Sequence, residues 1–133
     1  MRTTRILSTV AFFAVAGCHL GMSGADLPVA TQPDGARVSL RTASGAYAGE
    51  LLAVQDDGVI ISSDRIMFAP FSAIVSLNVE RMGGQYRLGR AEAPYGERLA
   101  QFRAVSRFPQ GLTPNTRSVL LAQKSQAEIA VIR

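Results

Sequence analysis

Short runs in which hydrophobic and polar residues alternate dominate positions 37–80 of the chain. The apolar runs lie at positions 38–40, 47–55, 59–61, 66–68 and 74–79. Turns rich in glycine and small polar residues separate several of them, as at Asp56-Asp57-Gly58, where glycine tolerates positive φ and aspartate hydrogen-bonds its own turn. The pattern predicts five short strands, with residues 70–73 forming one tight helical turn before the fifth.

The hydrophobic period lengthens towards the C-terminus. Apolar residues recur at helical spacing at Tyr95, Leu99, Phe102 and Val105. This spacing predicts a helix from Pro94 to about Arg107, with proline in its first turn. A second helix is expected to begin with Thr113 as N-cap and Pro114 as its first residue. The weak alternation at 128–133 indicates an additional edge strand.

Five short strands joined by tight turns favour a barrel, because closure removes exposed sheet edges. The spacing of the strand at 38–40, Gly45, the G-x-L sequence at 49–51, the acidic turn at 56–59 and the closing strand at 74–77 resembles the Sm-like or bacterial SH3-like barrel. That resemblance implies that Gly49 lies at a sharp strand bend, although an ordinary twisted hairpin would also accommodate it. The expected fold class is mainly β with C-terminal helices (α+β): a small five-stranded barrel with two short helices packed on it.

The N-terminal segment has the layout of an export signal. Arg2 and Arg5 precede an apolar run that ends in small residues at position 17, and the run is shorter than the roughly 20 residues that a membrane-spanning helix needs. The sequence VAGC at 15–18 contains the only cysteine and resembles the lipobox of bacterial lipoproteins. The resemblance implies cleavage before Cys18 and attachment of lipid, such as palmitate, to that residue. It also implies a place at the periplasmic face of the bacterial cell envelope. His19 stands where an aspartate often signals inner-membrane retention in such proteins, so the outer membrane is mildly preferred.

Four segments follow from these patterns. Residues 1–17 are expected to be the signal peptide, residues 18–36 a flexible tether, residues 37–80 the barrel, and residues 81–133 a linker followed by the helical segment. Removal of the signal takes away two arginines, so twelve basic and ten acidic residues remain and the formal charge falls to +2.

Arginine replaces lysine almost entirely, since Lys124 is the only lysine. Between the strands and Pro109 the arginines outnumber the acidic residues by four. In a domain tethered to a bilayer, such a surplus can face anionic headgroups, each charge contributing about 1 kcal/mol, or it can form ordinary solvated ion pairs. The candidate membrane or partner contacts are Arg87, Arg90, Arg98, Arg103 and Arg107.

The residues offer no catalytic constellation. His19 is the only histidine and lies beside the expected anchor, so a nucleophile in the barrel has no histidine base nearby and the usual zinc ligand sets are excluded. Asp56, Asp57 and Asp64 fall on predicted turns, where aspartate serves the backbone. We therefore expect no enzyme activity, no metal and no cofactor. Segments 56–60 and 69–72 stand where Sm-like proteins carry their RNA-contacting residues and differ from that pattern, so nucleic-acid binding is not expected.

Two functions remain after these exclusions. The first is a membrane-anchored envelope lipoprotein that acts as a non-enzymatic interaction module and binds an envelope protein or a peptidoglycan peptide. The second is a structural or ring-forming oligomeric subunit, in which Sm-like barrels associate edge to edge.

Overall fold

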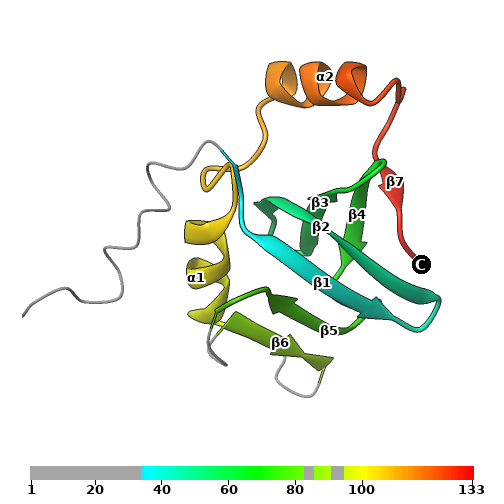
Figure 1. The fold of residues 1–133 in the computed structure, drawn as a ribbon. Helices are drawn as coiled ribbons and strands as arrows, with labels where there is room; N and C mark the ends of the chain where they lie inside the picture. Colours follow the sequence, from blue (N-terminus) through cyan, green and yellow to red (C-terminus); the bar gives the residue numbers. More distant parts are fainter. Residues whose placement is uncertain (1–33, 83–85, 91–94) are drawn as a thin grey trace, which may run out of the picture.

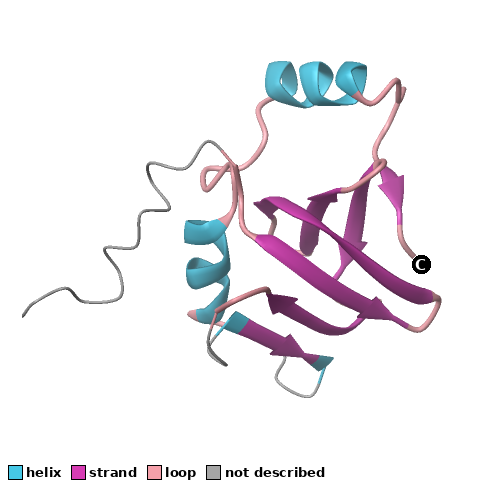
Figure 2. Ribbon diagram, viewed as in Figure 1, coloured by secondary structure: helices cyan, strands magenta, loops and turns pink. Residues whose placement is uncertain are grey.

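The computed structural model describes residues 34–82, 86–90 and 95–133, and this part of the chain forms one mixed seven-stranded sheet with two helices (Figure 1). The strand order is β6-β5-β1-β2-β3-β4-β7. The strands are β1 (Arg37–Thr42), β2 (Gly45–Val54), β3 (Gly58–Ser62), β4 (Ile66–Pro70), β5 (Ile74–Val79), β6 (Arg87–Gly89) and β7 (Ala130–Val131). The helices are α1 (Arg98–Val105) and α2 (Pro114–Gln123). Figure 2 shows that the two helices lie on different sides of the strands. The class is α+β, as the sequence predicts.

The prediction of a closed, five-stranded barrel was wrong. All five predicted strands are present as β1 to β5, but the sheet is open and contains seven strands. The physical reason is that the outer edges of the five-strand series pair with additional strands instead of with each other. Strand β6 pairs antiparallel with β5, and β7 pairs parallel with β4. The segment expected as a linker thus contributes a strand, while β7 confirms the predicted C-terminal edge strand.

One face of the sheet forms the main hydrophobic core. Its strand residues come from the inward positions of the alternating runs, such as Val38 and Leu40 of β1 and Leu77 of β5. Helix α1 packs Phe102 and Val105, both at most 1% exposed, into the same core. The C-terminal segment closes this core with Ile132, whose backbone N–H donates to the carbonyl of Phe68 at 2.9 Å.

The other face of the sheet is covered over only part of its width. Helix α2 places Leu120 and Leu121 against the outward residues of β2, β3 and β4. A bulge between Leu51 and Ala53 shifts the β2 register, and Leu52 joins this second core. The contiguous apolar residues of β2 and β3 are therefore buried on both faces of the sheet. No comparable cover lies over the outward residues of β1 and β5 within the described part of the chain.

Gly49 is required by close backbone approach. A Cβ atom at this position would overlap the carbonyl oxygen of Ser62 on β3, so no other residue fits without movement of the two strands. The sharp strand bend expected at Gly49 stays a prediction, because the register shift of β2 lies between Leu51 and Ala53.

The predicted helices are both present, and α1 is shorter than predicted at both ends. Helix α1 begins at Arg98, later than Pro94, because Gly96 adopts φ +51° and interrupts any helix that would begin before it; Pro94 itself lies outside the described residues. The helix ends at Val105. For α2 the prediction is confirmed, since Thr113 accepts a hydrogen bond from the Thr116 N–H at 3.2 Å and proline follows the cap.

The last residues of the expected tether are part of the fold. The N–H of Ala36 donates to the carbonyl of Val105 at 2.8 Å, and its carbonyl accepts from the N–H of Leu51 at 2.8 Å. Arg107 donates its backbone N–H to the carbonyl of Leu51 at 3.0 Å, which explains why the chain leaves the helix before residue 107. The incoming chain, the β2 bulge and the end of α1 therefore meet at one backbone junction.

Candidate functional site

A shallow polar hollow of about 400 Å³ lies over the uncovered face of the sheet. We define this polar hollow by its lining residues: Ser39, Leu40, Arg41, Ala46, Tyr47, Ala48, Ser76, Asn78 and Arg87. They come from four neighbouring strands, β2, β1, β5 and β6. The volume falls within the usual range of small-ligand sites, about 300 to 1,000 Å³.

The alternation of the strands explains the polarity of this hollow. In β1, Val38 and Leu40 point into the main core, so Ser39 and Arg41 point to the opposite face. In β5, the burial of Leu77 and Val79 directs Ser76 and Asn78 the same way. Because the strands are in register, these outward residues form two rows across the sheet.

The two arginines of the hollow, Arg41 and Arg87, lie in different rows and on different strands. One row runs across the sheet as Ala48, Ser39, Asn78 and Arg87. The other runs as Ala46, Arg41, Ser76 and Gly89. Arg41 and Arg87 are two strands and one row apart, which corresponds to about 12 Å between their Cα atoms at standard strand spacing. Ser76 and Asn78 of β5, which lie between the two arginines, have short side chains and form the floor there.

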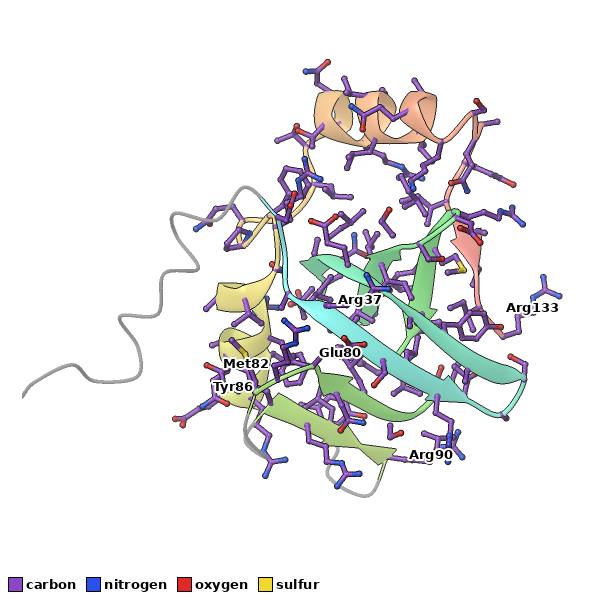
Figure 3. The ribbon with its side chains drawn as sticks, viewed as in Figure 1. Arg37, Glu80, Met82, Tyr86, Arg90 and Arg133 are labelled. Carbon is purple, nitrogen blue, oxygen red and sulfur yellow. The ribbon has the colours of Figure 1, made fainter. Side chains whose placement is uncertain are left out.

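The positive charge of the hollow is not neutralised by its surroundings. No carboxylate lines it, and neither Arg41 nor Arg87 forms an ion pair with any acidic residue that the structure describes. By contrast, Arg37 lies 3.7 Å from Glu80 at the start of β1, and Figure 3 shows these two side chains turned toward each other. The hollow is therefore an electropositive surface with neutral hydrogen-bonding groups between its charges.

The candidate arginines do not form a single surface. Only Arg87 lines the polar hollow, and its carbonyl accepts a hydrogen bond of 3.3 Å from the guanidinium of Arg98. Arg103 pairs with Asp56 at 2.6 Å, and Arg107 lies 3.6 Å from Glu50. Arg90, at the outer end of β6 in Figure 3, reaches the carbonyl of Ser72 at 3.5 Å.

The guanidinium groups of Arg103 and Arg107 thus make their contacts within the fold. Arg103 also donates to the carbonyl of Val54 at 3.3 Å, and the Arg107 guanidinium lies 5.4 Å from the ring centroid of Phe108. These contacts attach α1 and its C-terminal end to β2, so both side chains serve packing at that end of the sheet.

Sequence reasoning missed every residue of the polar hollow except Arg87, and Arg41 is the charged one among them. Its position after Leu40 in an alternating strand does show that it points outward. Arg41 lies near Arg87 only because β5 lies between β1 and β6 in the sheet. No local sequence pattern predicts that strand order.

The described residues contain no group of three or more histidine, cysteine, aspartate or glutamate side chains that could hold a metal ion. Cys18, the expected lipid attachment residue, lies outside the described residues. Among residues 34–82, 86–90 and 95–133, no helix is long and apolar enough to cross a membrane.

Comparison of the chain with protein-family models, curated proteins and solved structures found no match.

Proposed function

We propose that this protein is a lipid-anchored component of the bacterial cell envelope that acts as a non-enzymatic interaction module, with the polar hollow as its contact surface. The anchor is Cys18, for the reasons that the N-terminal sequence gives. More than one acyl chain on that residue would provide the stable attachment that a single chain does not.

The single observation that carries the interaction role is the unequal cover of the outer sheet face. Helix α2 buries the apolar half over β2, β3 and β4, while the half over β6, β5, β1 and the start of β2 stays open and polar. Unpaired arginines on a rigid sheet are suited to contacts with a partner, because the strands fix their positions before binding.

The expected tether supports this proposal, because it would hold the surface within reach of envelope partners. If the chain is cleaved before Cys18, residues 18–34 connect the anchor to the junction at Ala36. A flexible coil of that length spans about 20 to 25 Å. The hollow would then stand above the membrane surface, where a soluble segment of another envelope protein or a peptidoglycan peptide has access.

A ring-forming subunit, the second function expected from the sequence, has less support. Edge-to-edge association needs exposed strands, and the edges of the described sheet are β6 and β7, of three and two residues. Very short edge strands are a common way in which proteins avoid such pairing. Light scattering on the protein produced without its signal segment and lipid tests this, since a ring would give a multiple of the mass of that single chain.

Two measurements test the proposed function. Labelled palmitate should be incorporated into the wild-type protein and not into Cys18→Ser. A photoreactive amino acid in place of exposed Ala48, in the floor of the hollow, should then give discrete crosslinks in intact envelopes, whereas the same group in place of exposed Asn115 on α2 should not. Equal crosslinking from both positions would contradict the assignment of the contact surface.

A further inference from the structure

We infer that the polar hollow binds an extended acidic peptide segment of a partner protein, with carboxylate side chains on alternate residues. This inference rests on the proposed interaction role and adds the chemistry of the ligand. It follows from how the two arginines are combined with neutral hydrogen-bond donors.

Each arginine of the hollow has a neutral donor beside it on the next strand. Arg87 is the cross-strand partner of Asn78, and Arg41 is the cross-strand partner of Ser76. Residues directly opposite each other in an antiparallel pair have Cβ atoms about 5 Å apart. Side chains that start from Cβ atoms this close can donate from a guanidinium and from an amide or hydroxyl to the two oxygens of one carboxylate. The cross-strand pairs thus define two carboxylate subsites, Arg87 with Asn78 and Arg41 with Ser76.

The separation of the two subsites matches an extended peptide. Ser76 and Asn78 are alternate residues of one strand, so their Cα atoms are about 7 Å apart along it. The subsites are also displaced by one strand, which places their centres about 8 Å apart. In an extended ligand, side chains at i and i+2 point to the same side at a spacing of about 7 Å. Two glutamates at these positions can therefore reach both subsites together.

The donor groups of the hollow are not engaged with other described residues, so they are available to an anion. Ser39, Ser76 and Asn78 make no side-chain hydrogen bond to another described residue, and Arg41 and Arg87 make no ion pair there. A bound carboxylate would gain charge-assisted hydrogen bonds without breaking existing ones.

The observations favour a peptide over a membrane surface. The floor of the hollow consists of small residues, Ser76 and Asn78 between the two arginines and Ala46 and Ala48 on β2 beside Arg41, so the groups to be bound must enter a recess. Lipid headgroups would be drawn equally to any exposed arginine, for example Arg65 in the turn between β3 and β4. The two donor pairs are held at the spacing between alternate residues of an extended peptide. Lipid headgroups have no such fixed spacing.

The test uses the full lipidated protein in nanodiscs of phosphatidylcholine and three labelled peptides measured by fluorescence polarisation. The first peptide is acetyl-Ser-Glu-Ser-Glu-Ser-amide. The second replaces both glutamates by glutamine, and the third, Ser-Glu-Glu-Ser-Ser, keeps the charge but places the glutamates side by side. We expect the first peptide to bind, the second to show no saturable binding, and the third to bind at least about threefold more weakly.

Four variants locate the site. Arg41→Gln and Arg87→Gln should each weaken binding of the first peptide by about tenfold, the usual effect of losing one charge-assisted contact. Arg65→Gln removes the same charge from an exposed turn and should leave binding unchanged. Ala48→Tyr keeps every charge but fills the floor, and it should weaken binding by at least about tenfold. Thermal unfolding of each variant verifies that the fold is retained.

Specific results would overturn the inference. Equal loss from Arg65→Gln, or equal binding of the glutamine peptide, would show that no defined carboxylate site exists. Binding to phosphatidylglycerol vesicles that depends on Arg41 and Arg87, without peptide binding, would assign the hollow to lipid phosphate instead. If these peptides fail while crosslinks from position 48 still form in envelopes, the ligand chemistry is wrong and the interaction role stands.

Discussion

Replacement of Phe102 by alanine tests whether α1 belongs to the same cooperative unit as the sheet. Phe102 is fully buried and packs in the main core with Leu88 of β6, and its ring centroid lies 6.3 Å from that of Tyr86. Truncation of a buried phenylalanine costs about 3 to 5 kcal/mol, because transfer energy is lost and a cavity remains. Total stability of a small domain is about 5 to 15 kcal/mol, so the change removes a large share of it.

The assay is urea unfolding of the purified protein followed by far-UV circular dichroism. We expect the free energy of unfolding of Phe102→Ala to fall by at least about 3 kcal/mol with an unchanged denaturant slope, and the melting temperature to fall by about 12 °C or more. The matched control is Gln101→Ala, an exposed neighbour on the same helix, which should change the free energy by less than about 0.5 kcal/mol. A loss below about 1 kcal/mol for Phe102→Ala, or two separate unfolding transitions, would refute the single shared core.

Three further substitutions test individual features of the fold by the same unfolding measurement. Gly49→Ala should destabilise the protein by about 1 to 3 kcal/mol, because the added methyl group overlaps the carbonyl of Ser62; a neutral effect would show that β2 and β3 are less closely apposed. Thr113→Ala should cost about 1 kcal/mol, because the N-cap hydrogen bond to Thr116 is lost, whereas Thr113→Ser should retain most of the stability. Ile132→Ala should cost about 2 kcal/mol if the C-terminal segment closes the main core, and a change within about 0.5 kcal/mol would contradict that role.

The strands and helix ends that depend on short-range sequence signals were predicted correctly from those signals. The alternation in residues 37–80 located β1 to β5, and the Thr113-Pro114 pair located the start of α2. The start of α1 was misplaced because the hydrophobic period continues through Gly96, while the backbone there has a positive φ. That conformation is open to glycine but is not dictated by it.

Long-range pairing was not predictable in the same way. Strand β6 has one buried apolar residue, Leu88, between two residues that give no strand signal, so no period can be recognised. Its pairing with β5, and the pairing of β7 with β4, decide that the sheet stays open. The polar hollow has the same origin, since Arg41 and Arg87 become neighbours only through the order β1-β5-β6. Sequence reasoning named Arg87 as a contact residue but had no means of joining it to Arg41.

The openness of the polar hollow follows from the composition of a single strand. Along β2 the outward residues change from Ala46 and Ala48 to Leu52 at the bulge, and only the second part is apolar enough to hold α2. An extension of helical cover over the first part would bury the guanidinium of Arg41 without a carboxylate partner, at a cost of several kcal/mol and with little apolar area gained. Packing and desolvation energies therefore account for both halves of the outer face. The uncovered half keeps its charges exposed because no part of the described chain would gain from covering them.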